Sequence, residues 1–384
     1  MTTNGSRRIV IVGGGISGLS IAVRLSQSGL PVILLEAGSL GRVASSKNQG
    51  WLYSGAWFAP RQAQLARLCH ESLKQTIRFC PDCLEPATHS MIYVVTTPGA
   101  NPAYWTNAWE ACGLPYENVP LNVVLDETQI PESTVQHAFR LPDRAIRCDT
   151  LLERLTAKAE YQGVDIRTES AVTALLKSGD QVRGVVTAKR EEIEARLVIL
   201  AANVGGAGLW PETSTTCRQT EFTRVALKTH CLAIRPTLAT TPFCLVDRDG
   251  LNHIPHGPAS VFGTSRWIPV LDRTYQQAIG TELERLRNLV ANLYPRCRFE
   301  EHQIDEWAGT TVQAMHVDQV EPGLAPMPTV IDHEREPPCL TNLLSVFPGR
   351  ASLWPQLAEA TRNVVLDKLK VGSPPTAMPP WAIA

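Results

Sequence analysis

The sequence of 384 residues lacks an excess of charge of either sign, because 36 lysines and arginines offset 37 aspartates and glutamates. A balanced charge argues against nucleic acid and anionic membranes as partners, since both attract strongly basic surfaces. The sequence also lacks a run of about 18 apolar residues that could span a bilayer. Its first apolar run, IVIVGGG, contains glycines that suit a turn better than an export signal. We therefore expect a cytoplasmic protein that acts on small molecules, with no nucleic acid partner and no transmembrane segment.

Cysteine is present, but in no dense pattern. The 10 cysteines are spread along the chain, which favours reduced thiols over a disulfide framework. One close pair, Cys80 and Cys83, occurs in the motif CPDC. A tetrahedral zinc site needs two further ligands at similar spacing, and the sequence has no second close pair. We therefore predict no metal site and keep a redox pair as the alternative for this motif.

The first 36 residues have the pattern of strand, helix and strand. The run Ile9 to Val12 is apolar throughout, as expected for a parallel strand that is covered on both faces. Residues 16–27 carry apolar side chains at helical spacing, and Gly29 can end that helix. The segment PVILLE, residues 31–36, supplies the second buried strand. The sequence therefore predicts a βαβ unit here.

A glycine motif lies between the first strand and the helix. Gly13, Gly15 and Gly18 form GxGxxG, and Glu36 ends the second strand. The glycines permit a tight turn, close approach of backbone to a pyrophosphate and close packing of helix on strand. The helix N-terminus attracts the phosphate charge, and a carboxylate at the position of Glu36 can accept hydrogen bonds from ribose hydroxyls. With both strands and the acid in register, the motif predicts a dinucleotide site.

Segments of α/β type enclose a region of a different pattern. From about residue 217 the sequence reads as alternating strands, with a strong hairpin signal at Asp249 and Gly250. We therefore predict an α/β fold, α+β overall, in which a Rossmann-type nucleotide domain carries an inserted antiparallel β-sheet substrate domain. The nucleotide domain would comprise residues 1–80, 141–215 and 325–384, and the substrate domain residues 81–140 and 216–324.

Several stretches resemble one family. The opening IVIVGGGISGLSIAVRLSQSGLPVILLEAG resembles that of FAD-dependent oxidoreductases related to D-amino acid oxidase. SSKNQGWLYSGAWFAP, residues 45–60, resembles their loop in which a serine pair precedes a glycine-containing segment beside the flavin. NLLSVFPGRASLWPQLAEA is similar to the final strand, turn and helix of flavin-linked glycerol-3-phosphate dehydrogenase. The branch that contains this enzyme and L-2-hydroxyglutarate oxidase is the most similar, and the resemblance spans nearly the whole chain.

The resemblance implies FAD as the cofactor and suggests which residues hold it. The glycine motif would bind the pyrophosphate, and Glu36 the adenosine ribose. The serine pair would reach the pyrophosphate or ribityl chain, with the following segment along the isoalloxazine. Val172 would contact adenine through its backbone, and the final turn would wrap the pyrimidine edge of the flavin, where the helix N-terminus stabilises negative charge. The implied cofactor-binding residues are Gly13, Gly15, Ile16, Ser17, Gly18, Glu36, Ser45, Ser46, Asn48, Gln49, Gly50, Val172, Gly349, Arg350, Ala351, Ser352 and Leu353.

The substrate-binding positions depart from this resemblance. Where the glycerol-3-phosphate enzymes have an arginine and a tyrosine after the loop glycines, this chain has Trp57 and Phe58. Their anion-binding arginine after the tryptophan-alanine-glycine segment corresponds to Thr311, and the lysine of their last turn corresponds to Arg350. Two of three anion-binding positions are thus lost. We expect a substrate that is less anionic or more aromatic than glycerol 3-phosphate.

Three residues are the candidates for catalysis. Arg350 could pair with a carboxylate or offset charge on the flavin, or else form a buried ion pair. Tyr53 could orient a substrate hydroxyl or only pack. Arg266 could supply a replacement anion site, as could Arg61, although an exposed arginine is the commoner outcome.

Two histidines come next in order of interest. His253 and His256 flank a strand dipeptide and could act as a base. The alternative, which we favour, is that both are surface histidines of a hairpin.

Together these features predict an FAD-dependent dehydrogenase or oxidase. It would transfer hydride from a small substrate with a CH–OH or CH–NH group to flavin N5, and pass the electrons to oxygen, a quinone or another acceptor. One alternative is an amino acid or amine oxidase of the glycine oxidase type. Another is a flavoprotein that keeps FAD but has a binding or scaffold role.

Overall fold

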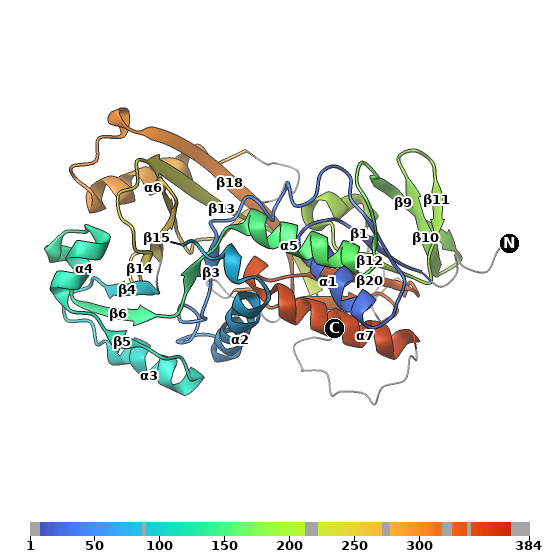
Figure 1. The fold of residues 1–384 in the computed structure, drawn as a ribbon, viewed down its shortest axis with the longest axis horizontal. Coiled ribbons are helices and arrows are strands. Elements are labelled where there is room, and N and C mark those ends of the chain that lie inside the picture. Colours follow the sequence, from blue (N-terminus) through green and yellow to red (C-terminus); the bar gives the residue numbers. More distant parts are fainter. Residues whose placement is uncertain are drawn as a thin grey trace.

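The computed structural model describes residues 8–86, 90–211, 222–270, 277–316, 325–335 and 339–369, and its architecture is mixed α/β. Its first layer is a six-stranded sheet with β1 between β2 and β12 (Figure 1). All neighbouring strands in this sheet are parallel except the edge pair β19–β20. In sheet order, the strands are β19 (Thr329–Asp332), β20 (Leu343–Phe347), β12 (Leu197–Leu200), β1 (Ile9–Val12), β2 (Val32–Leu35) and β8 (Asp165–Arg167).

The central strands are apolar throughout because each face of the sheet packs on a different core. Ile9 and Ile11 of β1 face a cluster with the helices, whereas Val10 and Val12 face a cluster with a second, three-stranded sheet. This burial on both faces confirms the prediction made from the apolar run. The helices are α1 (Ile16–Gln27), α5 (Cys148–Tyr161) and α7 (Trp354–Leu369), and the small sheet contains β9 (Val172–Ser178), β10 (Gln181–Thr187) and β11 (Glu192–Glu194).

The other large layer is a nine-stranded sheet at the opposite end of the molecule (Figure 1). Its strands come from two separate stretches of the chain, residues 91–141 and 222–316. The sheet is antiparallel, as predicted, except at one pair, because β4 and β14 run parallel. No hairpin joins these two strands, so no tight turn fixes their relative direction. The strands are β4 (Met91–Val95), β5 (Glu117–Asn118), β6 (His137–Leu141), β13 (Phe222–Arg235), β14 (Phe243–Leu245), β15 (Leu251–His256), β16 (Ala259–Gly263), β17 (Ile268–Val270) and β18 (Gln303–His316). The domain boundaries given above stay a prediction.

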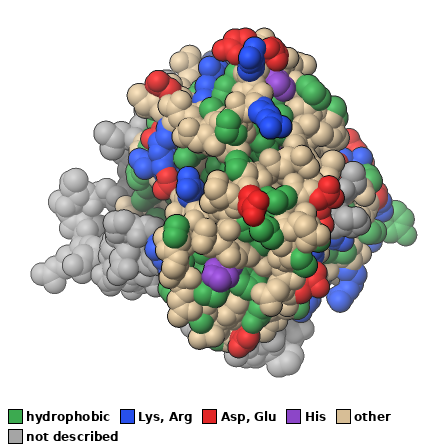
Figure 2. Space-filling view, turned by 90° about the vertical axis from the view of Figure 1, so that its left-hand side faces the viewer, with side chains coloured by type: hydrophobic (Ala, Val, Ile, Leu, Met, Phe, Trp, Pro, Cys, Tyr) green, Lys and Arg blue, Asp and Glu red, His purple; other side chains and the backbone are tan. Residues whose placement is uncertain are grey.

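The remaining elements connect and cover the two layers. β3 and β7 form a short antiparallel pair, and η2 and η7 are single turns of 3-10 helix. Charges of both signs are interspersed on the face shown in Figure 2, in keeping with the balanced composition. Within the described residues, no helix has the length and apolar character needed to cross a membrane. The bounds are α2 (Ala63–Phe79), α3 (Ala103–Cys112), α4 (Leu121–Thr128), α6 (Gly280–Leu293), β3 (Trp51–Leu52), β7 (Arg144–Ala145), η2 (Pro81–Cys83) and η7 (Ala351–Leu353).

Candidate functional site

A cavity of about 530 Å³ lies where the two layers meet. One wall is formed by the carboxyl ends of β1, β2 and β12, at Val12, Leu35 and Ala201. Strands β13 and β18 of the nine-stranded sheet form the opposite wall, with Thr229 and Thr311 among the lining residues. The carboxyl edge of a parallel sheet is where α/β folds bind ligands, so this cavity is the candidate site.

The glycine motif has the geometry that its spacing predicts. Gly13 has a φ of +112°, and a Cβ there would lie 2.6 Å from Ala202 Cα. Gly18 does not line the cavity, because it faces the carbonyl of Gly13 with no room for a Cβ between them. Gly15, at the start of α1, does line the cavity. The motif therefore opens the first turn of α1 onto the cavity.

Glu36 lines the cavity, but its carboxylate already accepts two hydrogen bonds. Gly14 N donates to Oε2 at 2.7 Å, and Gly38 N donates to Oε1 at 3.0 Å. An ionised carboxylate has about four acceptor positions, so hydroxyl groups of a ligand can still donate to it. Glu36 therefore fixes two loops while presenting acceptors to the cavity.

The two serines of the predicted pair differ in their position. Ser45 lines the cavity, and its Oγ accepts a hydrogen bond of 3.0 Å from Ile16 N at the N-terminus of α1. Ser46 is exposed and is not among the lining residues. The structure thus gives a cavity-facing position to Ser45 and none to Ser46.

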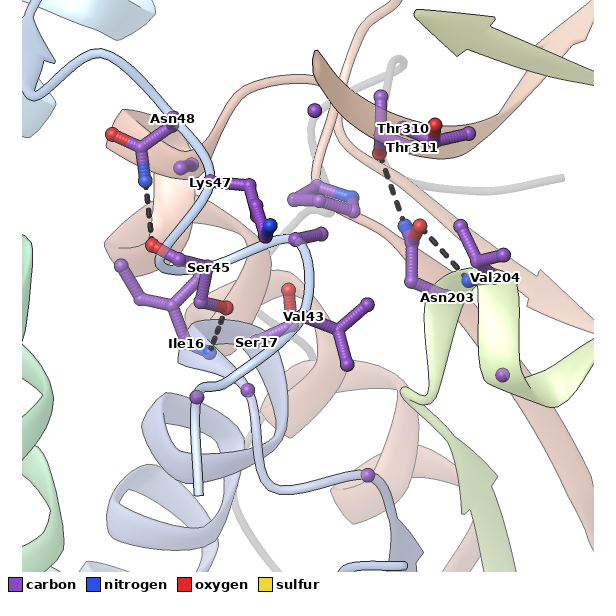
Figure 3. Close-up of a pocket in the computed structure, with 18 of the residues that line it drawn as sticks. Ile16, Ser17, Val43, Ser45, Lys47, Asn48, Asn203, Val204, Thr310 and Thr311 are labelled. Atoms are coloured by element: carbon purple, nitrogen blue, oxygen red, sulfur yellow. Dashed lines mark hydrogen bonds between the residues drawn. The ribbon is translucent and has the colours of Figure 1, made fainter. Parts of the chain in front are cut away.

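The segment after the serines is held by the nine-stranded sheet. Asn48 and Gln49 line the cavity, whereas Gly50 lies behind it. The Gln49 amide donates to Val261 O of β16 at 3.2 Å, and Trp307 Nε1 of β18 donates to Lys47 O at 3.1 Å. Figure 3 shows the Lys47 side chain directed between the Ser45 loop and the wall of Asn203 and Thr311.

The final turn also reaches the cavity. Gly349, Arg350, Ala351 and Ser352 line it, as does Val172 at the start of β9, whereas Leu353 is buried in the core beside it. Gly349 N donates to Gln313 Oε1 at 2.9 Å. The side chain of Gln313 on β18 therefore fixes the turn that precedes α7.

Arg350 is a cation enclosed by aromatic rings. Its guanidinium carbon lies 4.0 Å from the ring centre of Trp267, 5.0 Å from that of Phe58 and 5.4 Å from that of Tyr53. Its Nε is buried without a hydrogen-bond partner, and no carboxylate pairs with it within the described residues. Burial lowers its pKa, yet a guanidinium stays charged at neutral pH. The predicted alternative, a buried ion pair at Arg350, is therefore wrong among the residues that the structure describes.

Tyr53 belongs to a stacked aromatic wall. Its ring stacks on Trp51 with centres 4.2 Å apart, and both side chains line the cavity. Trp51 Nε1 donates to the buried carboxylate of Asp143 at 2.9 Å, which fixes the indole. Burial raises the pKa of Tyr53 to about 12, so the phenol stays protonated and can donate a hydrogen bond at neutral pH.

Three other candidates lie away from the cavity. Arg266 is half exposed and faces Glu282 of α6, with Nε 3.5 Å from Oε2, and Arg61 is exposed. Trp57 packs beside Trp105 with ring centres 6.0 Å apart. These side chains belong to loops, and the sequence does not reveal toward which side of the molecule a loop side chain points. These positions give no support to a catalytic role for Arg266 or a replacement anion site at Arg61.

The two histidines are not the surface pair that we favoured. His253 is fully buried, with Nδ1 3.2 Å from Thr241 O and Nε2 2.9 Å from Ser260 Oγ. Burial lowers its pKa to about 3. His256 is half-buried between two polar groups and does not line the cavity. Neither histidine is placed to act as the base.

The CPDC motif forms a turn in which Cys80 and Cys83 are buried while Pro81 and Asp82 are exposed. Cys80 and Cys83 are free thiols whose pKa values are raised by burial, which disfavours the reactive thiolate. In the described ranges, no group of three or more histidine, cysteine, aspartate or glutamate side chains could hold a metal ion.

Sequence reasoning missed several lining residues because their pairing partners are distant in the chain. Asn203 lies after β12 and donates from Nδ2 to Thr311 Oγ1 at 3.2 Å. His230 accepts at Nε2 from Ile279 N at 3.0 Å, and burial lowers its pKa to about 4. Trp267 lines the cavity beside Arg266, and no local pattern tells which of these two neighbours faces inward. For Asn203, the position just after a buried parallel strand was a usable signal.

Comparisons with known proteins extend over most of the chain. The model of a family described as FAD dependent oxidoreductase, DAO, matches residues 8–332. One subunit of the anaerobic glycerol-3-phosphate dehydrogenase from Escherichia coli strain K12 is 28% identical over 207 residues, which cover 52% of this chain and 38% of that protein. Glycine oxidase of Pseudomonas aeruginosa is 29% identical over 208 residues, which cover 51% of this chain and 55% of that protein. The matched region therefore spans well under two thirds of either relative. The crystal structure of glycine oxidase from Geobacillus kaustophilus is similar in fold, with a TM-score of 0.73, 18% identity and 99% of both chains covered.

Proposed function

Because the chain belongs to the family of FAD-dependent oxidoreductases, we propose that it oxidises a small carboxylic acid with a hydroxyl or amino group on the carbon next to the carboxylate. The observation that carries this proposal is the environment of Arg350 at the wall of the cavity, because its Nε is buried and unpaired and it has no acidic partner among the described residues. Such a group leaves a guanidinium fork available for a ligand carboxylate.

The residues around the cavity fit FAD as the cofactor. The first turn of α1 has no acidic residue and opens onto the cavity, which suits a pyrophosphate. Ser45, Lys47 and Arg42 lie at the same part of the lining and offer donors to phosphate oxygens. Glu36 and Val172 would hold the adenosine end. The bound cofactor would supply the acceptor for the hydride that leaves the substrate carbon.

The chain itself would bind and orient the substrate. Arg350 would hold the carboxylate, and the protonated Tyr53 would donate a hydrogen bond to a substrate oxygen. The rings of Trp51 and Trp267 line the cavity, so they favour a substrate with a flat or apolar part and exclude water from the reacting carbon. Thr311, in place of a second cation, argues against a phosphate-bearing substrate.

The alternative of amine oxidation is favoured by the relative named glycine oxidase, whereas alcohol oxidation is favoured by the relative named glycerol-3-phosphate dehydrogenase. Both reactions fit Arg350, because an amino acid and a hydroxy acid present the same carboxylate. A requirement for the substrate carboxylate therefore does not distinguish oxidation of a hydroxyl group from oxidation of an amino group. The electron acceptor, whether oxygen, quinone or another oxidant, also needs an experiment of its own.

The proposal is tested by anaerobic bleaching of the bound flavin with a panel of amino and hydroxy acids and their amides. We expect bleaching by an acid and none by its amide. Arg350→Met should weaken the apparent affinity for that acid by roughly tenfold to a hundredfold, the size of a charge-assisted hydrogen bond to a buried group. Arg350→Lys should recover part of this loss.

The matched control is Arg266→Met, which removes a half-exposed arginine outside the cavity. Bleaching that is equally weakened in both variants would contradict the role given to Arg350. A protein that binds FAD but is bleached by no member of the panel would favour the scaffold alternative.

A further inference from the structure

We propose that His256 and Glu85 form a proton-dependent clamp that positions residues 48–50 at the wall of the cofactor cavity. His256 is the last residue of β15, and its Nδ1 lies 2.8 Å from Glu85 Oε1. Its Nε2 lies 2.9 Å from the backbone oxygen of Gln49. A Cβ on Gly50 would lie 2.6 Å from His256 Cε1, so the ring packs directly on this segment. The ring thus joins the nine-stranded sheet to the loop after Ser45.

The two partners require one proton more than a neutral imidazole carries. A carbonyl oxygen and a carboxylate can only accept hydrogen bonds, whereas a neutral ring has one donor and one acceptor nitrogen. Both bonds form together only when the pair of His256 and Glu85 holds an additional proton, which makes the ring an imidazolium or the acid a carboxyl group. Loss of that proton leaves either Gln49 O or the carboxylate facing a lone pair.

Among the described residues, the titratable and charged groups on the strands beside β15 do not supply this proton. His253 lies on the same strand, and burial lowers its pKa to about 3, so it stays neutral. On the neighbouring strand β14, burial keeps Cys244 a neutral thiol by raising its pKa. Strand β7 packs against β15 and carries Arg144, which is half-buried and positively charged. Strand β16 has no titratable residue. Within the part of the chain that the structure describes, Glu85 is the acid that faces the ring.

The clamp matters for the cofactor because residues 48 and 49 line the cavity. This inference rests on the proposed position of FAD along that segment. Loss of this proton on raising the pH takes one anchor from the loop, so FAD affinity falls. His256 is a positioning residue, because it acts on the cofactor through Gln49 and Gly50.

The experiment combines two measurements on the full chain. In the protein without cofactor, ¹⁵N NMR of the ring nitrogens follows the protonation of His256 with pH. Titration of the same protein with FAD, followed by quenching of FAD fluorescence, gives the dissociation constant from pH 6 to pH 9. In the wild-type protein we expect affinity to fall by about tenfold over this range, as one hydrogen bond of a charged group is lost.

Two variants separate a clamp from a merely structural contact. His256→Gln should bind FAD weakly at every pH, with a flat profile. Glu85→Gln should bind as tightly at pH 9 as at pH 6, because an amide NH₂ can donate to Nδ1 while a neutral ring donates from Nε2 to Gln49 O. The control is His137→Gln, which replaces an exposed histidine on β6 and should keep the wild-type profile.

The outcomes decide between this inference and the proposed function. A wild-type profile that does not change with pH, or a Glu85→Gln profile identical to it, would overturn the clamp even if FAD binds. If His256 gains its proton in the NMR titration but the chain binds no FAD, the proposed function fails and the clamp survives as a feature of the loop. If His256→Gln does not fold, Glu85→Gln still tests the clamp.

Discussion

At Gly18, helix α1 packs directly on the loop that follows β1, because glycine has no side chain. A Cβ there would overlap the carbonyl oxygen of Gly13, and backbone cannot move aside as a flexible side chain can. We therefore expect Gly18→Ala to destabilise the protein by about 1–3 kcal/mol, as overpacking does, and to weaken FAD binding by displacing the first turn of α1. Thermal unfolding without cofactor and FAD titration measure the two effects. Gly280→Ala is the control, because a Cβ at Gly280 meets no atom within 4 Å.

Residues of local motifs were predictable, whereas residues placed by distant pairing were not. The spacing of Gly13, Gly15 and Gly18 depends only on one turn, and the structure brings their loop to the cavity. The choice between Arg266 and Trp267 depends on the direction of a loop after β16, which no spacing rule encodes. The burial of His253 likewise results from strand pairing and the aromatic rings of Phe243 and Phe262 on either side.

The loop of residues 45–50 has little regular structure of its own and owes its shape to other elements. Trp307 of β18 donates to Lys47 O, and the Gln49 amide donates to Val261 O of β16. Helices and buried strands were predictable because periodicity determines them. The sequence connects this loop to a cofactor only through the family resemblance, since its anchors on β16 and β18 lie more than 200 residues away.

We expect Trp307→Phe to weaken FAD binding severalfold while changing the free energy of unfolding by about 1 kcal/mol or less, because one hydrogen bond is lost and the ring stays. Trp105→Phe, at a half-buried tryptophan of α3, serves as control. FAD titration and urea unfolding measure both quantities. Equal FAD affinities in the two variants would show that the bond to Lys47 does not shape the loop.

The molecule as a whole should lose stability in mild acid. Burial lowers the pKa of His253 to about 3 and those of His230 and His333 to about 4, from an ordinary value of 6.5. Between these values the unfolded chain binds more protons than the folded one, so the free energy of unfolding decreases as the pH falls from 6.5 towards 4. Each histidine contributes a slope of up to about 1.4 kcal/mol per pH unit.

Urea unfolding at pH 7, 6 and 5 measures this slope. In His253→Gln we expect the slope of the free energy of unfolding against pH to decrease by the contribution of one histidine. The reason is that the buried ring, which resists protonation in the folded state, is gone. His137→Gln should keep the wild-type slope, since that side chain is exposed. An unchanged slope in His253→Gln would mean that His253 titrates alike in both states.

Along strand β18, the residues that face the cavity are different from the residues that pack in the core. Side chains alternate along a strand, so Thr311 and Gln313 face the cavity while Val312 and Ala314 lie in the core. Gln313 is tied to the turn of Gly349, and the Thr311 hydroxyl accepts hydrogen bonds from the side-chain amides of Asn203 and Gln313. A substitution at Thr311 therefore changes the cavity wall and its bonds to Asn203 and Gln313, while the core-facing side chains of the same strand keep their packing.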